Sequence, residues 1–222
     1  MAFITSKLYH LRPAARFDTL CAVEFGTRQP PVPLGAKEKD ETMADEKTQS
    51  LGIYREMFRL MLSEGIVKLI HNDSTDHACV LIEELLHFAK ENVLIFCRNL
   101  GSDVWATPAI LSALDEALSR NGMRMRVLLQ EPPAGGGANR ALALLRRHGV
   151  DVRQTHNTDV TANFIVIDDK AYRLEKDVAN RRGYACANDP QNAAKLVEAF
   201  DALASDSEQI VTNGAGQAEP TR

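Results

Sequence analysis

The sequence predicts an α/β domain in which a mixed β-sheet is covered by helices on both faces. Short apolar runs alternate along the chain with longer amphipathic stretches, and such alternation is typical of α/β folds. One of these runs, residues 93–97, is apolar throughout, as expected of a strand that is buried on both faces. At 222 residues the chain is long enough for one sizeable domain of this class.

Capping and helix-breaking residues set the limits of the expected helices. Ser74 or Asp73 can accept hydrogen bonds from the first free amides of one helix, and Pro108 fits the first position of another. Gly149 ends a third helix. The helices are expected over residues 51–62, 74–90, 107–120, 139–148 and 190–203.

The expected strands are short, and the run 131–137, with two Pro and three Gly, is a loop. We expect strands over residues 67–70, 93–97, 124–129, 150–152, 164–167 and 184–187. Five residues are predicted to lie together in the buried centre: Val93, Ile95, Phe164, Val166 and Phe200.

The two ends of the chain differ from its middle. Residues 1–49 contain the Pro-rich run 29–33 and a charged run of mixed sign, which predict a flexible leader. Met43 precedes a more regular beginning, so residues 1–42 can also be read as an extension upstream of the start. The α/β domain is expected over 50–205, followed by a disordered tail over 206–222.

Composition excludes few functions. The net charge of −4 names no class of partner, and no cofactor is indicated. The four Cys are far apart without a CxxC pair, which is typical of reduced thiols in a cytoplasmic protein. No apolar run approaches the roughly 18 residues that a membrane span needs.

One segment has polar residues at fixed positions around an apolar strand. Residues 161–168 read Thr-Ala-Asn-Phe-Ile-Val-Ile-Asp, which places Thr161, Asn163 and Asp168 at the spacing of a His-x-Lys-x₄-Asp motif. This segment resembles the signature of the phospholipase D superfamily. The likeness extends from Ile66 to Leu203 as a single family repeat, and it includes the Arg-rich strand 124–129 and the Gly-Val-x-Val strand at 149–152.

The resemblance implies a phospholipase D-like fold more clearly than a reaction. In competent members the His attacks phosphorus and the Lys steadies the phosphate charge. Here Thr161 stands in the place of the His and Asn163 in the place of the Lys. The family's Gly-Ser-x-Asn should fall at residues 175–178, which read Glu-Lys-Asp-Val instead. We therefore expect a pseudoenzyme that acts as a binding or regulatory module, with Asp168 as a structural carboxylate.

The alternative is a divergent phosphodiesterase or nuclease with a rearranged site. It would use His156 with Thr161 and Asp168, and His71 or His77 could join them. That hypothesis requires a His side chain within hydrogen-bonding reach of Thr161 or Asp168. Residues 71–77 hold two His and two Asp and could also bind a metal ion, although their place before a helix favours a capping loop.

Arginines indicate the candidate partners. Residues 119–153 hold seven Arg against two acidic residues, and such a segment can meet a phosphate backbone or simply cover solvated faces. The 170–182 region is read as a solvated hairpin with paired charges. We expect a homodimer or a protein partner, with weak nucleic-acid binding through a set of candidate residues: Arg124, Arg126, Arg146, Arg147, Arg173, Arg181 and Arg182.

Overall fold

The computed structural model describes residues 38–135, 138–157 and 159–210. The chain separates into two compact units, residues 1–41 and 42–222, and the sheet belongs to the second. The leader expected over 1–49 lies outside the described residues as far as residue 37, and so does the tail after residue 210.

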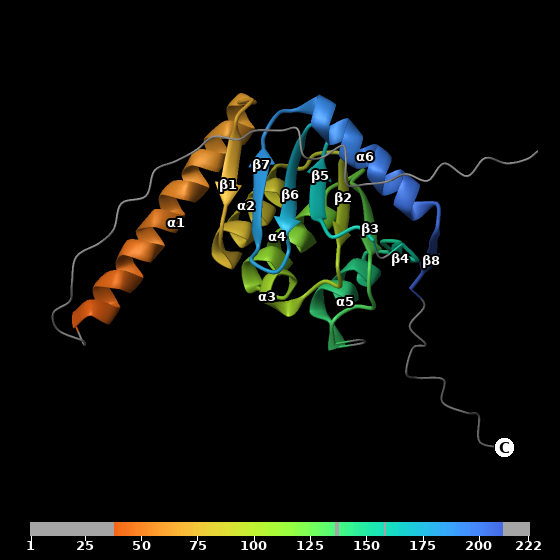
Figure 1. Ribbon diagram of the computed structural model, residues 1–222, viewed down its shortest axis with the longest axis horizontal. Helices are drawn as coiled ribbons and strands as arrows, with labels where there is room; N and C mark the ends of the chain where they lie inside the picture. The colour runs from red at the N-terminus through yellow and green to blue at the C-terminus, as the bar shows by residue number, and fades with distance from the viewer. Residues whose placement is uncertain (1–37, 136–137, 158, 211–222) are drawn as a thin grey trace, which may run out of the picture. The chain divides into compact units, whose positions relative to one another are not determined.

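An eight-stranded mixed sheet forms the centre of the second unit (Figure 1). Its strands run in the order β1-β7-β6-β5-β2-β3-β4-β8. The three strands β2, β3 and β4 are parallel, and every other neighbouring pair is antiparallel. Their bounds are β1 Leu69–Asn72, β2 Asn92–Cys97, β3 Arg124–Leu129, β4 Val152–Thr155, β5 Asn163–Ile167, β6 Ala171–Asp177, β7 Arg182–Cys186 and β8 Ser207–Gln209.

Helices cover both faces of this sheet, which confirms the predicted fold class. Ser74 accepts a hydrogen bond from the amide of His77 and begins α2, as the sequence predicts. Asn139 and Asp189 begin α5 and α6 in the same way. The bounds are α1 Glu38–Glu64, α2 Thr75–Phe88, α3 Ser102–Trp105, α4 Pro108–Leu118, α5 Arg140–Arg147 and α6 Pro190–Ala204.

The core consists of two apolar clusters, one on each face of the sheet. The larger joins Val93 and Ile95 of β2 to helices α1, α2, α4 and α5. The smaller places Phe164 and Val166 of β5 against Phe200 of α6. All five residues are buried, but the single centre expected for them is wrong. The register sets Val93 and Ile95 opposite Ile167 and Ile165, which leaves Phe164 and Val166 on the other face of the sheet.

Helix α1 is fixed to the domain by buried charge. Glu84 of α2 is fully buried and accepts hydrogen bonds from two α1 arginines, at 2.5 Å from Arg55 Nη1 and 2.7 Å from Arg59 Nε. Tyr54 donates to the carbonyl of His71 in β1 at 2.8 Å. These contacts place α1 beside the β1 edge of the sheet (Figure 1).

Four regions differ from the prediction, and one of them is the short helix α3, which the sequence does not predict. Helix α1 begins at Glu38 rather than at residue 51, because the Glu and Lys residues of its charged first half favour a helix even without an apolar face. The start of the expected tail pairs with β4 as β8. The 170–182 hairpin has a buried polar face rather than a solvated one. Among the described residues, no helix has the length and apolar character needed to cross a membrane.

Candidate functional site

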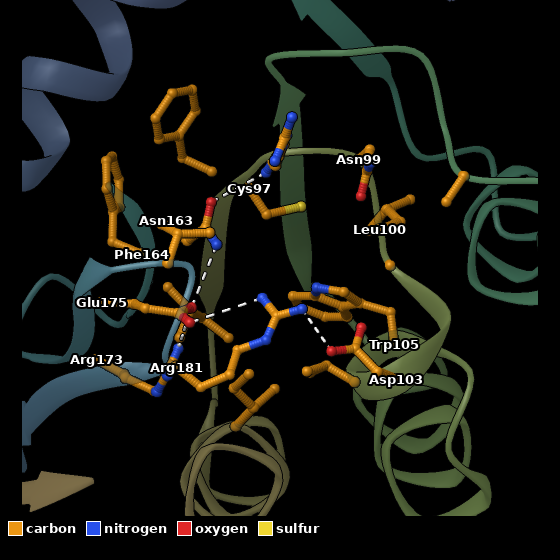
Figure 2. A pocket seen from close by; sticks show the side chains of 18 of the residues that line it. Cys97, Asn99, Leu100, Asp103, Trp105, Asn163, Phe164, Arg173, Glu175 and Arg181 are labelled. Carbon is orange, nitrogen blue, oxygen red and sulfur yellow. Dashed lines mark hydrogen bonds and ion pairs between the residues drawn. The ribbon is translucent and has the colours of Figure 1, made fainter. Parts of the chain in front are cut away.

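A cavity of about 560 Å³ opens where strand β2 ends and strand β5 begins. Its wall combines the β2–α3 connection with β5, β6 and the β6–β7 turn (Figure 2). This place matters because β2 pairs with β3 in parallel and with β5 in antiparallel orientation. The carboxyl end of a strand at such a change of direction is where α/β sheets commonly bind ligands.

Asn163 lines this cavity, and each polar atom of its side-chain amide makes a hydrogen bond. Its Oδ1 accepts a hydrogen bond from the backbone amide of Arg98 at 3.0 Å. Its Nδ2 donates to Glu175 Oε2 at 3.2 Å. The side chain is buried, so it ties the end of β2 to strands β5 and β6.

A buried ion pair lies beside Asn163 on strand β6. Arg173 Nη1 donates to Glu175 Oε2 at 3.2 Å, and both residues are at most 3% exposed. Arg173 Nε also donates to Asn72 Oδ1 of β1 at 3.2 Å. Burial lowers the pKa of Arg173, and the carboxylate of Glu175 opposes that shift. This arrangement keeps two opposite charges inside the domain by pairing them.

The ion pair of Arg173 and Glu175 leaves two hydrogen-bonding atoms without a partner. Arg173 Nη2 and Glu175 Oε1 are buried without a hydrogen-bond partner. Arg181 Nη1 lies 3.7 Å from Glu175 Oε1, within ion-pair distance but too far for a hydrogen bond. Such buried polar atoms lower stability because they have lost water without gaining a full replacement.

Arg181 extends this network across the cavity to helix α3 (Figure 2). Its guanidinium lies between Glu175 and Asp103, and it donates a hydrogen bond to Asp103 Oδ2. Its backbone carbonyl accepts from Asn72. Both Arg181 and the cavity residue Leu100 have positive φ, a conformation that costs energy for residues other than Gly.

Asp168 lies at the other end of strand β5 and serves the backbone. Its carboxylate accepts hydrogen bonds from the amides of Lys90, Glu91 and Asn92 at 2.9 to 3.2 Å. These amides precede and open β2, so the carboxylate fixes the start of that strand to the end of β5.

The structure does not bring the residues of a rearranged site together. Thr161 is exposed two residues before β5, and Asp168 follows the opposite end of that strand. His156 is exposed after β4, and its amide donates to the carbonyl of Asp206. His77, His87 and His148 pair with acidic side chains instead. Among the described residues, no histidine side chain forms a hydrogen bond or ion pair with Thr161 or Asp168.

The seven candidate arginines do not form one surface. Arg173 is buried and Arg181 lines the cavity. Arg126 pairs with Asp201 and lies over the Phe200 ring, whereas Arg147 pairs with Asp115 of α4. Arg146 donates to the carbonyl of Ile210, and Arg124 and Arg182 are exposed on β3 and β7.

The loop 71–77 has the contacts of a helix cap. Asp73 pairs with His77 at 2.9 Å, and Ser74 caps α2. No group of three or more potential metal-ligating side chains gathers within the described residues. Trp105 is buried in the cavity wall, and burial raises the pKa of the neighbouring Cys97 thiol to about 12. At this pKa the thiol stays protonated near neutral pH and is a poor nucleophile.

Sequence reasoning missed the ion pair of Arg173 and Glu175 as a site feature. Tyr172 and Leu174 alternate with Arg173 and Glu175, and this period of two marks a strand with one polar face. That signal identifies the strand, but a polar face normally points to solvent. Only the register shows that Glu175 lies opposite Asn163.

Similar folds occur in proteins of known structure. A phospholipase D family member from Salmonella typhimurium, Nuc, superposes with a TM-score of 0.51 at 16% identity, covering 66% of this chain and 99% of its own. NucT from Helicobacter pylori has a TM-score of 0.50 at 11% identity, covering 64% and 100%. These similarities confirm the predicted phospholipase D-like fold.

A third similar structure is TrmBL2, an archaeal chromatin protein described as showing a novel mode of DNA binding. Its TM-score is 0.51 at 14% identity, and the match covers 78% of this chain and 67% of the other. A sequence search of curated proteins finds no match. A family model matches residues 74–212, more than half of the chain, and the protein therefore belongs to the family described as a domain of unknown function, DUF7931.

Proposed function

We propose that this protein is a non-catalytic phospholipase D-like domain that acts as a binding or regulatory module. One observation carries the proposal: the residue in the place of the family Lys is committed to the fold. Asn163 uses its oxygen for the Arg98 amide and its nitrogen for Glu175. A neutral side chain held in this way cannot supply the fixed positive charge that stabilises a developing phosphate anion.

The charges around the cavity support the same proposal. Each of the three arginines that line it has a carboxylate partner: Arg98 pairs with Glu131, Arg173 with Glu175 and Arg181 with Asp103. The positive charge that an incoming phosphate would meet is therefore already partly neutralised by these carboxylates. This internal pairing favours a structural network over a phosphate site.

The missing nucleophile is the second support. Thr161 has no histidine or carboxylate partner among the described hydrogen bonds, so nothing there activates its hydroxyl. Loss of a covalent nucleophile typically lowers the rate by several orders of magnitude. Asn163 therefore bears on stabilisation of the phosphate charge, and Thr161 bears on attack at phosphorus.

The test is hydrolysis by the purified full chain. Substrates are bis-p-nitrophenyl phosphate and single- and double-stranded DNA, each with and without divalent metal ions. A competent phospholipase D family enzyme serves as the positive control for each substrate. We expect no product above the buffer blank, because neither attack on phosphorus nor charge stabilisation is provided.

Two variants make that test decisive. Turnover that disappears in Thr161→Ala or His156→Ala would overturn the proposal and favour the divergent phosphodiesterase. Turnover that persists unchanged in both variants and is removed by further purification would indicate a contaminating enzyme. Circular dichroism of each variant checks that the fold is intact.

A protein partner is favoured over nucleic acid by the distribution of charge. The candidate arginines are scattered, and four of the seven have carboxylate partners: Arg126, Arg147, Arg173 and Arg181. Nucleic-acid binding would instead depend on exposed cations and would weaken steeply with salt. Fluorescence anisotropy with labelled DNA at low and physiological salt separates these cases. Tight binding that falls steeply with salt and weakens in Arg124→Gln would favour nucleic acid.

A further inference from the structure

Three large apolar side chains are exposed on one side of helix α1. Ile53, Met57 and Leu60 are 65%, 46% and 56% exposed, and we call these three residues the α1 stripe. Their spacing of four and then three residues places them on the same face of the helix. Single exposed apolar residues need no explanation, whereas a contiguous apolar group marks an interaction site.

Contacts elsewhere on α1 keep the stripe exposed. Phe58 and Met61 are buried in the larger core cluster. Arg55 and Arg59 donate hydrogen bonds to the buried Glu84 of α2. The helix therefore cannot rotate to cover the stripe without breaking ion pairs to a buried carboxylate, which is strongly destabilising.

The stripe is the middle of a longer seam. Glu46 and Ser50 precede it and Glu64 follows it, and these six residues are separated by alternating steps of four and three. We call the six residues the α1 seam. Such alternation is the repeat by which one α-helix packs along another. At a rise of about 1.5 Å per residue the seam spans roughly 27 Å, and a long, narrow seam fits a second helix better than a broad globular surface.

The α1 seam is acidic at both ends. Glu46 and Glu64 are exposed, and neither forms an ion pair with another described residue. Glu56 is exposed beside the stripe, and Arg59 neutralises it in part at 3.1 Å. The seam itself contains no Lys or Arg, so its net charge is negative. Acidic residues at these positions favour a partner with basic residues opposite them.

We propose that the α1 seam binds an amphipathic α-helix of a different protein, whose apolar residues repeat at steps of four and three and whose ends carry Lys or Arg. The apolar residues of that helix cover the stripe, and its basic residues face Glu46 and Glu64. The inference rests on the proposed function in that it names a partner for the binding module. No residue of the seam lines the cavity. Phosphodiester hydrolysis would therefore overturn the proposed function without affecting the seam.

The charges of the seam disfavour other occupants. A second copy aligned in parallel would set each Glu of the seam against its own copy. An antiparallel copy centred between Glu46 and Glu64 would set these two residues against each other. Like charges at such positions repel and select against the pairing. Nucleic acid and anionic lipid surfaces are repelled for the same reason.

The small size of the seam sets the expected affinity. Two helices in contact over a few turns bury less than the roughly 800 Å² per partner of a standard interface. We therefore expect a dissociation constant on the order of tens of micromolar. The charged ends should contribute more to discrimination between partners than to affinity.

Fluorescence anisotropy of labelled peptides titrated with the full chain tests the proposal. The basic peptide has about three heptads with Leu at the apolar positions, Lys at both ends, and Ala and Gln elsewhere. The acidic peptide has Glu in place of each Lys. The scrambled peptide has the composition of the basic peptide but no apolar face. We expect the basic peptide to bind at least about tenfold more tightly than either of the others.

Variants of the chain assign the binding to the seam. Met57→Lys places a charge in the middle of the stripe and should weaken binding of the basic peptide by at least about tenfold. Ala194→Lys adds the same charge at an exposed position of α6 and should leave that binding unchanged. Glu46→Lys/Glu64→Lys reverses the charge of both ends and should make the acidic peptide the tighter ligand. Circular dichroism checks that each variant is folded.

Several outcomes would overturn the proposal. Equal affinity for the basic and acidic peptides would do so, and so would an affinity that the scrambled peptide shares or that survives Met57→Lys. Absence of binding at about ten times the expected dissociation constant would have the same consequence. Sedimentation of the full chain without peptide completes the test. A dimer that Met57→Lys dissociates would show that a second copy occupies the seam instead.

Discussion

The two ends of strand β5 belong to one sequence motif, but their polar side chains have different kinds of partner. At the Asp168 end, the carboxylate holds three backbone amides at the start of β2. At the Asn163 end, a neutral amide has joined a buried network with Glu175 and Arg173. One end of the strand therefore supports backbone amides, whereas the other end belongs to a buried side-chain network.

The difference shows why spacing and chemistry must be read separately. A strand of fixed length places residues at its two ends regardless of their identity, so the spacing of the motif reports the fold. A reaction depends on which polar atoms face the cavity and on whether they are already hydrogen-bonded within the protein. Here the Arg98 amide and the Glu175 carboxylate already occupy both polar atoms of Asn163.

The largest expected effect comes from breaking the buried pair at the Asn163 end. Arg173→Met leaves Glu175 buried without its main cation, and such a change typically costs about 3–5 kcal/mol. The double variant Arg173→Met/Glu175→Leu removes both charges and should recover most of this loss. Chemical denaturation measures both. If the double variant is as unstable as the single one, the pair matters through packing and not through charge.

Substitution of Asp168, at the other end of β5, should lower the stability of the protein less. Asp168→Ala removes the acceptor of three backbone amides and should lower the free energy of unfolding by about 1–2 kcal/mol. Asp169→Ala is a close control, because Asp169 also has positive φ but accepts a hydrogen bond from the half-buried Asn92 side chain rather than from backbone amides. Equal losses in the two variants would show that backbone conformation, and not capping, explains the effect.

A smaller effect is expected from an exposed ion pair outside both ends. His148 and Arg147 lower the pKa of Asp115 below its usual value. A lowered pKa in the folded state stabilises the protein above the ordinary carboxyl pKa, and this contribution is lost as the pH falls through the lowered value. Asp115→Asn should therefore slightly flatten the acid side of the stability–pH profile. An unchanged profile would show that solvent screens the pair completely.

Most of the fold could be predicted from the sequence because its signals are local. The cap at Ser74, Pro108 at the start of α4 and the apolar run of β2 fix their elements through short-range chemistry. The sequence predicts too short a helix α1 and no strand β8. The first half of α1 is charged, and β8 is a short terminal strand, so neither has a clear hydrophobic pattern.

The candidate site could be predicted only in part. The positions of Thr161, Asn163 and Asp168 at the two ends of β5 follow from the motif, whereas the lack of catalysis remains a proposal. The partners of Asn163 do not follow from the motif, because Arg98 and Glu175 are distant in sequence and meet only through the pairing of β5 with β2 and β6. The exposure of the α1 stripe likewise depends on which face of α1 the Glu84 contacts select.

The stability of two neighbouring variants tests the central claim most directly. If Asn163 is committed to the fold, Asn163→Ala should lower the free energy of unfolding by about 1–3 kcal/mol, because it leaves the Arg98 amide and Glu175 without their partner. Thr161→Ala, two residues away and exposed, should change it by less than about 0.5 kcal/mol. An Asn163→Ala variant as stable as the parent protein would contradict the account, because it would show that the side chain is free to serve a ligand.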